Sequence, residues 1–476
     1  MDESSSSKPI SDWKDIDTSY RFPTLFLVAK ATGWLLISTL FSLLASIKMH
    51  SPEFLSNCSW VTYGVLVPAA RNAFIYGFAL QAGFAAMLWM TMRLGQVKLR
   101  GPGFLFIGMI LWNLALVLGI LGLMGGGLSG YAFLDMPGFV YPMLFTAYAL
   151  IGGMAILTFF KRQVRELYPS QWFIYASFYW FPWMLTIASY ALFSSEPARG
   201  IAQALINQWY VSGMTTIVLG FVGLALVQYF IPKLSGRDLY SSHLSFFAFW
   251  MMLLFGGLTG LLEAQSLPAW AGVISSVCSH FVSLAWVIVA YNLWKSLQGS
   301  GRGSDPFALL LVRAAALSGL VGALLTAWGS RPAAAEVVQF SLFLPGLTWL
   351  QLFGFVGTLL LVSIYYFLPR VTELPWKSGG LLSWKGVMTC YFSGVSLISL
   401  VYLVGGWKQG KTLADASKSF AEVQAAAMTF IRISTVGELL VFVAALMVCL
   451  KVTGMLIAQL RAYIQCCCSC KSEATQ

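Results

Sequence analysis

The chain has 476 residues, of which 58% are apolar and only 10% are charged. A soluble domain carries about 25% charged residues, so this composition excludes a water-soluble enzyme and predicts one polytopic membrane domain surrounded by lipid. The net charge of +11 is typical of basic loops that flank membrane spans, and it predicts no nucleic-acid partner.

Twelve segments are long and apolar enough to cross a membrane, which takes about 20 mostly apolar residues per helix. Runs of this length exclude the short alternating strands of a β-barrel. We therefore predict an all-α integral membrane protein, a twelve-helix transmembrane bundle. In chain order the predicted spans are Thr24–Ile47, Asn72–Met92, Phe104–Met124, Gly138–Phe160, Trp172–Phe193, Trp209–Ile231, Leu244–Leu262, Ala269–Trp294, Phe307–Trp328, Phe340–Leu368, Gly386–Val404 and Ala427–Leu450.

The basic residues outside these spans are distributed unequally. The two terminal segments and the even-numbered connections carry 19 Lys and Arg, against six in the odd-numbered connections when Arg71 is counted with the end of the second span. The positive-inside rule then places both termini in the cytoplasm, and we expect the bacterial inner membrane. The predicted organisation is a cytoplasmic N-terminal segment (1–22), one transmembrane domain (23–462) and a Cys-rich cytoplasmic tail (463–476).

Cysteine and histidine limit the metal chemistry that is possible. The tail holds Cys466, Cys467, Cys468 and Cys470, but adjacent cysteines do not present the separated pairs of a zinc site. We interpret them as a reduced tail at the membrane surface. Histidine occurs only at His50, His243 and His280, which excludes any mechanism that needs four or more histidine ligands.

Several local stretches occur in the order seen in one family of membrane proteins. Together they resemble the catalytic subunit (subunit I) of the haem-copper oxidases, of the cbb(3) type, over about residues 21 to 460. The resemblance implies the twelve-helix bundle of an oxygen reductase with two haems and one copper, packed against a membrane-anchored c-type cytochrome. The stretches are Pro68–Ala73 (P-A-A-R-N-A), Trp209–Pro232 (opening W-Y-V-S-G-M), Leu267–Trp270 (L-P-A-W), Tyr365–Arg370 (Y-Y-F-L-P-R) and Gly406–Gly410 (G-W-K-Q-G), with Arg432 later.

The resemblance also implies six histidine ligands, and all six are replaced. Alanine and leucine have no donor atom, a serine hydroxyl is at most a weak ligand, and the tryptophan ring nitrogen only donates a hydrogen bond. We therefore predict no catalytic residue, no bound haem and no metal site, with the bulkier replacements filling the space into a solid interior. The replacing residues are Ala70 in span two, Ser212 in span six, Leu261 and Leu262 in the Gly260–Leu262 segment of span seven, and Leu347 and Trp349 in span ten.

Four ionisable residues inside spans are further candidates, because buried ionisable groups in membranes are costly. They are His280, Glu263, Arg432 and Glu438. We expect the His280 ring to bond a neighbouring serine or carbonyl, and Arg432 to pair with Glu438 or a carbonyl. These groups are scattered over different spans, so we expect no continuous proton path.

The favoured hypothesis is a non-catalytic homologue of the oxidase subunit, acting as a structural or assembly component of a respiratory electron-transfer membrane complex. One alternative is a functional oxidase-like subunit with unconventional haem ligation. Another is a proton or solute transporter built on the same bundle, because a fold does not by itself determine function.

Overall fold

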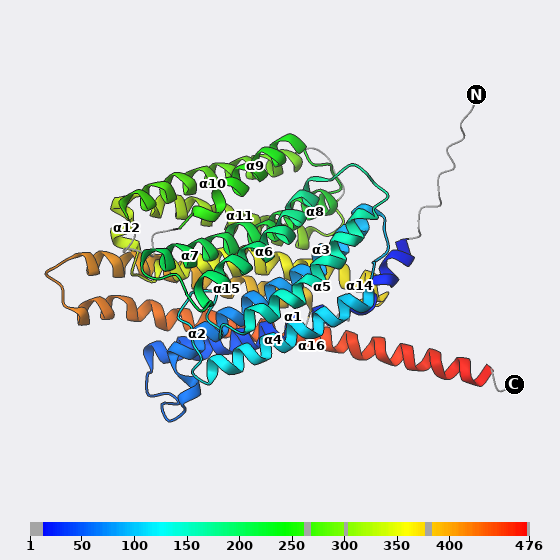
Figure 1. Cartoon of the computed structure of the whole chain (residues 1–476), viewed down its shortest axis with the longest axis horizontal. Coiled ribbons are helices and arrows are strands. Elements are labelled where there is room, and N and C mark those ends of the chain that lie inside the picture. The colour runs from blue at the N-terminus through cyan, green and yellow to red at the C-terminus, as the bar shows by residue number, and fades with distance from the viewer. Residues whose placement is uncertain (1–12, 261–267, 299–302, 377–382, 474–476) are drawn as a thin grey trace.

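The computed structural model describes residues 13–260, 268–298, 303–376 and 383–473, with side chains as far as residue 465. Within these ranges the regular structure consists of helices that run side by side in a bundle (Figure 1). The long helices are α1 (Trp13–His50), α2 (Tyr63–Asn72) continued by η2 (Ala73–Ala79) and α3 (Leu80–Gly95), α4 (Pro102–Met124), α5 (Val140–Phe160), α6 (Pro169–Phe193), α7 (Ile201–Gly213) continued by η3 (Met214–Leu219) and α8 (Gly220–Ser235), α9 (Ser242–Phe255) with η4 (Gly256–Leu258), α10 (Ala269–Ser296), α11 (Pro306–Gly329), α13 (Phe343–Thr348) continued by η6 (Trp349–Gly357) and α14 (Thr358–Thr372), α15 (Trp384–Ala414) and α16 (Phe420–Glu473); η1 (Ser59–Val61) and α12 (Pro332–Val338) are short connectors.

These helices confirm the predicted fold class. In the described residues, ten are long and apolar enough to cross a membrane. The other two predicted spans correspond to α6, which is rich in Trp and Tyr, and to the shorter apolar unit Ser242–Leu258.

Several helices extend beyond the predicted spans: the second begins at Tyr63, the sixth at Ile201, and α15 continues to Ala414. The first helix already begins at Trp13, and the last continues to Glu473 through the predicted tail. The seventh span was predicted to reach Leu262, but its helix ends at Leu258, and Leu261 and Leu262 lie outside the described residues. Hydropathy reports the part of a helix that suits the lipid interior, whereas backbone hydrogen bonds continue into polar sequence.

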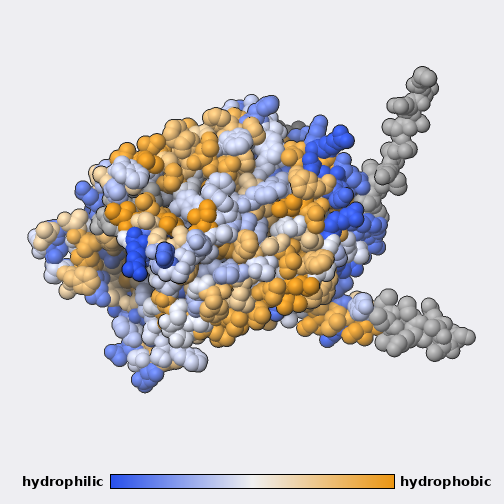
Figure 2. Space-filling model, in the orientation of Figure 1, coloured by the Kyte–Doolittle hydropathy of each residue, from blue (hydrophilic) through white to orange (hydrophobic). Residues whose placement is uncertain are grey.

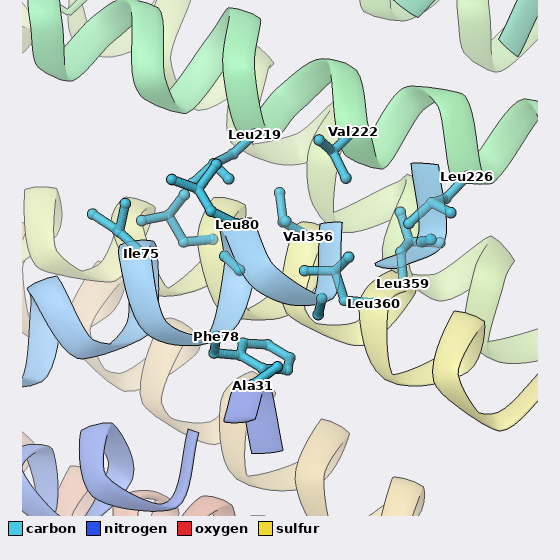
Figure 3. Packing of buried hydrophobic residues seen from close by; sticks show 14 of the residues in the cluster. Ala31, Ile75, Phe78, Leu80, Leu219, Val222, Leu226, Val356, Leu359 and Leu360 are labelled. Atoms are coloured by element: carbon cyan, nitrogen blue, oxygen red, sulfur yellow. The ribbon is translucent and has the colours of Figure 1, made fainter. Parts of the chain in front are cut away.

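Three helical units form the interior of the bundle. We number the helical units by the predicted span to which each corresponds: the second is α2–η2–α3, the sixth α7–η3–α8, the seventh α9–η4 and the tenth α13–η6–α14. In the most apolar part of each helix, the second, sixth and tenth units are 100%, 83% and 83% buried, against 33–50% for the other candidate spans. Figure 3 shows Leu80, Val222 and Val356, one from each of these units, pointing toward one another. Side chains on the outer helices, such as Phe104 and Leu121 of α4, remain exposed, as expected for a surface that faces lipid.

Each inner unit contains a π-helical segment: η2, η3 and η6. A π-helical turn is rare and is found frequently at functional sites, because its wider ladder displaces backbone and side chains locally. The three segments therefore mark positions in the core that regular helix packing does not explain.

The G-W-K-Q-G stretch has a packing role. Gly406 and Gly410 lie one turn apart on α15, and a Cβ at Gly410 would clash with the Val337 carbonyl of α12. Gln409 accepts a hydrogen bond from the Leu342 backbone N–H at 2.9 Å. Small residues thus allow close helix approach, as is usual in membrane bundles.

The start of α1 and the C-terminal end of α16 lie at the same end of the bundle (Figure 1). There α3, α8 and α14 end, with Arg93, Lys233 and Arg370 in their last turns. Figure 2 shows hydrophilic residues gathered there. We refer to it as the basic end.

Candidate functional site: two pockets in the bundle

Four positions that replace histidines lie on the inner units, beside the π-helical segments. Ala70 lies three residues before η2, Ser212 lies two residues before η3, and Trp349 opens η6, two residues after Leu347. All four side chains are buried. The structure brings them together in two pairs, each on the wall of its own pocket.

The first pair, Ala70 and Trp349, lines a pocket of about 240 Å³ between α1, α2 and the start of the tenth unit. Aromatic rings form much of its wall: Phe353 stacks on Phe74 with ring centroids 3.8 Å apart and on Trp349 at 3.9 Å. We call this space the aromatic pocket. Ser38 on α1 also lines it, and its hydroxyl donates to the Ala70 carbonyl at 2.8 Å.

The second pair, Ser212 and Leu347, lines a pocket of about 160 Å³ between the sixth, seventh and tenth units. We call it the hydroxyl pocket, because neutral hydroxyl and amide groups dominate its polar wall. They belong to Gln208, Ser212, Thr215, Thr216, Thr259, Thr326, Thr348 and Gln351.

These groups bond mainly to one another and to nearby carbonyls. The Ser212 hydroxyl donates to the Gly256 carbonyl at 2.9 Å and lies 2.8 Å from the Thr259 hydroxyl. Gln208 donates to the carbonyl of Gly260, the described member of the Gly260–Leu262 segment, at 2.8 Å. The seventh unit is thus tied to the sixth by hydrogen bonds at the place where the resemblance implies copper ligands.

Arg71 lines both pockets. Its Nη2 lies 2.5 Å from Oδ1 of the buried Asp135, and the Asn72 amide donates to the other carboxylate oxygen at 2.6 Å. Asp135 comes from the loop between α4 and α5, which Asn207 also holds through the backbone N–H and C=O of Ala132. This ion pair fastens the loop beside the pockets.

The expected solid interior is incomplete, because a pocket of about 160 Å³ and one of about 240 Å³ remain at these positions. The larger replacement side chains pack within the pocket walls: Trp349 stacks on Phe353, and Leu347 packs in a small cluster with Val338 and Phe343. Ala70 and Ser212 are too small to fill the remainder.

The other candidate residues are not brought together. His280 is exposed on α10, and its Nδ1 lies 2.7 Å from the Ser276 carbonyl, which confirms the expected local hydrogen bond. The expected pairing of Arg432 with Glu438 is wrong. Arg432 is exposed on α16, about 1.7 turns away from the buried Glu438 on the same helix. Glu263 lies outside the described residues.

Glu438 is buried between α16 and α1. Its Oε1 accepts from the Ser42 hydroxyl at 3.1 Å, and among the described residues its Oε2 has no hydrogen-bond partner. Ser42 also lines the aromatic pocket, so this carboxyl lies one residue behind the pocket wall.

Sequence reasoning missed Asp135. It is the only acidic residue in the loop 125–139, between two apolar spans. The signal that could have found it is this isolated acid together with the Arg-Asn pair at the start of another span.

The donor set at the paired positions does not fit haem iron or copper. Copper is held mainly through imidazole or sulfur, and haem iron through imidazole, sulfur or a tyrosine oxygen. Ala70 and Leu347 have no donor atom, and Trp349 has only an N–H. Ser212 has only an alcohol hydroxyl, which donates to the Gly256 carbonyl. In the described residues, His, Cys, Asp and Glu form no group of three that could hold a metal ion.

Residues 23–440 match the protein family described as "Cytochrome C and Quinol oxidase polypeptide I". The chain belongs to this family. The match confirms the resemblance read from the local stretches. The pairing of Ala70 with Trp349 and of Ser212 with Leu347 supports their assignment to the family's ligand positions, which itself stays a prediction.

Relatives within the polypeptide I family are distant. The chain is 25% identical over 389 residues to "Cbb3-type cytochrome c oxidase subunit CcoN1" of Stutzerimonas stutzeri, covering 74% of this chain and 75% of the relative. It is 23% identical over 467 residues to "Cytochrome c oxidase subunit 1 homolog" of Agrobacterium tumefaciens (strain T37), covering 90% and 82%.

The fold is similar to a chain in a cryo-EM structure of a haem-copper terminal oxidase dimer. The TM-score is 0.68 at 14% identity, and the superposition covers 91% of this chain and 84% of the other. At this identity the likeness shows a shared fold alone.

Proposed function

We propose that this chain is a haem- and copper-free, non-catalytic member of the polypeptide I family that serves as a structural or assembly subunit of a respiratory membrane complex. One observation carries the proposal: paired positions from different inner helices line two pockets, and none of these side chains can bond a metal through an imidazole.

The hydrogen bonds in the hydroxyl pocket support the same conclusion. Ser212 and Gln208 use their donors on Gly256 and Gly260 of the seventh unit. These bonds hold the two helices together directly, so the bundle has internal contacts where the resemblance implies that a metal would connect them.

The partners and the orientation are part of the proposal. Relatives carry the name cytochrome c oxidase subunit, and the outer helices present apolar side chains on which another membrane-anchored subunit, such as a c-type cytochrome, can pack. We place the basic end, with both termini, on the cytoplasmic side of a bacterial inner membrane, as the positive-inside rule requires.

The test is an absorbance spectrum of the purified chain, reduced minus oxidised, together with its iron and copper content. We expect no haem signal and no stoichiometric metal. A haem signal stoichiometric with protein would overturn the proposal and favour unconventional ligation.

Purification from native membranes tests the second half of the proposal. We expect cytochrome subunits to co-purify with the chain. If the chain instead purifies alone and a specific solute raises its melting temperature, the transporter alternative replaces the scaffold.

A further inference from the structure

A third pocket lies at the basic end of the bundle. It has a volume of about 960 Å³ and is formed where helices from separate parts of the chain end. Four basic residues line it: Arg93 from α3, Lys233 from α8, Arg237 just after α8, and Arg370 from α14. Basic loops are expected on this side of any membrane protein, but these four converge on one hollow.

The charges on this wall are only partly neutralised. Arg93 pairs with Asp17, and Asp238 is an acidic residue of the lining. Lys233 is exposed and Arg370 is exposed, and neither forms an ion pair with a described carboxylate. The pocket therefore keeps an excess of positive charge that an anion can neutralise.

Aromatic residues hold the basic groups in place. The Arg370 guanidinium carbon lies 3.5 Å from the centre of the Tyr366 ring, and the guanidinium donates to the Tyr366 carbonyl. This contact orients the Arg370 guanidinium while leaving its other N–H groups for a ligand. Tyr168 is also on the wall and donates to the Gln228 carbonyl at 3.0 Å. Burial raises the pKa of Tyr168 to about 12, so its phenol stays neutral and the wall gains no extra negative charge.

We infer that this basic pocket binds a phosphate group. Planar guanidinium forks match phosphate oxygens in pairs, and a lysine adds a mobile point charge. The volume lies within the range of small-molecule sites, so it has room for a phosphate ester rather than a bare ion. Two sources share this chemistry: the headgroup of an anionic phospholipid, for which basic pockets between helix ends are suited, and a soluble phosphate compound.

The test uses the full-length chain in detergent micelles and compares two probes. One probe is phosphatidylglycerol added to the micelles, with phosphatidylcholine, a zwitterion of no net charge, as its counterpart. The other probe is inorganic pyrophosphate. Native mass spectrometry counts bound molecules, and the shift in melting temperature gives affinity. The double variant K233Q/R370Q removes two pocket charges, and K161Q/K295Q removes two charges from the same end outside the pocket.

We expect one probe to bind with one-to-one stoichiometry, and K233Q/R370Q to weaken it by about tenfold or more, while K161Q/K295Q binds as the unchanged chain does. Sensitivity with phosphatidylglycerol identifies a lipid headgroup, and sensitivity with pyrophosphate identifies a soluble phosphate. Equal losses in both double variants, or no binding of either probe, would overturn the inference. If K233Q/R370Q does not fold, the exposed single variant K233Q carries the same comparison.

Discussion

The aromatic pocket and the hydroxyl pocket lie on the same inner helices, and Arg71 lines both, yet their walls are built differently. In the aromatic pocket, Phe353 stacks between Phe74 and Trp349. In the hydroxyl pocket, Ser212 and its neighbours are joined by hydrogen bonds to carbonyls of the seventh unit. One wall is held by ring packing and the other by polar contacts.

The difference shows that the residues in place of the histidines stabilise the helix bundle in two ways, by ring packing in one pocket and by hydrogen bonds in the other. Where two helices face each other across the aromatic pocket, dispersion between large rings holds the wall. Where the seventh unit ends at Leu258 and its carbonyls are free of helix partners, hydroxyls satisfy those carbonyls. Each replacement therefore suits the backbone beside it, and the two pockets should respond differently to mutation.

The largest expected effect comes from the ion pair shared by both pockets. D135A leaves Arg71 without its carboxylate in a partly buried site, and breaking such a pair costs about 3–5 kcal/mol of stability. Thermal unfolding in detergent measures the loss. The matched control is D15A, which breaks the exposed Lys98–Asp15 pair and should cost at most about 1 kcal/mol. Equal losses would show that Asp135 does not fasten the loop.

The aromatic pocket should respond next. F353L keeps an apolar side chain but removes two stacked ring pairs, each worth about 0.5–1.5 kcal/mol, so we expect a loss of about 1–3 kcal/mol in the same unfolding assay. Phe178 provides the control: it is buried, and among the described residues it stacks with Phe84 alone, at the longer centroid distance of 6.3 Å. A loss in F178L as large as in F353L would mean that the ring stack has no special role.

The hydroxyl pocket should respond less. S212A removes two polar contacts, and hydrogen bonds inside membrane proteins average about 0.6 kcal/mol each, so the expected loss is about 1 kcal/mol. The control S363A removes a hydroxyl whose one bond within the described residues goes to the Leu360 carbonyl of its own helix, and it should be close to neutral. If the two variants unfold alike, the hydrogen bonds between the sixth and seventh units do not stabilise the pocket.

The sequence predicted the twelve helices because long apolar segments can satisfy their backbone in lipid only as helices. It did not predict where α1 begins or where α16 ends, since hydropathy carries no information on helix continuation into polar sequence. It also identified the residues Ala70, Ser212, Leu347 and Trp349 that come together in pairs.

Whether side chains fill the space between those residues or leave a pocket could not be predicted from the sequence. Side-chain size favoured a solid interior, but the direction in which Trp349 packs is a three-dimensional property, and here the ring turns onto Phe353. Asp135 was missed because its partner Arg71 lies 64 residues away in the chain, and only the folded loop brings the two together.

The smallest effect concerns which small guest, xenon or water, occupies each pocket. This measurement distinguishes the two pockets most directly. Apolar cavities stay dry and take up xenon, whereas polar ones of sufficient size hold bound water. In crystals under xenon pressure we expect anomalous density in the aromatic pocket and ordered water in the hydroxyl pocket. A70L should displace the xenon, because the larger side chain enters that pocket, and should leave the waters unchanged. Xenon in both pockets, or water in both, would show that their walls do not differ in the way that the ring stack and the hydroxyl groups require.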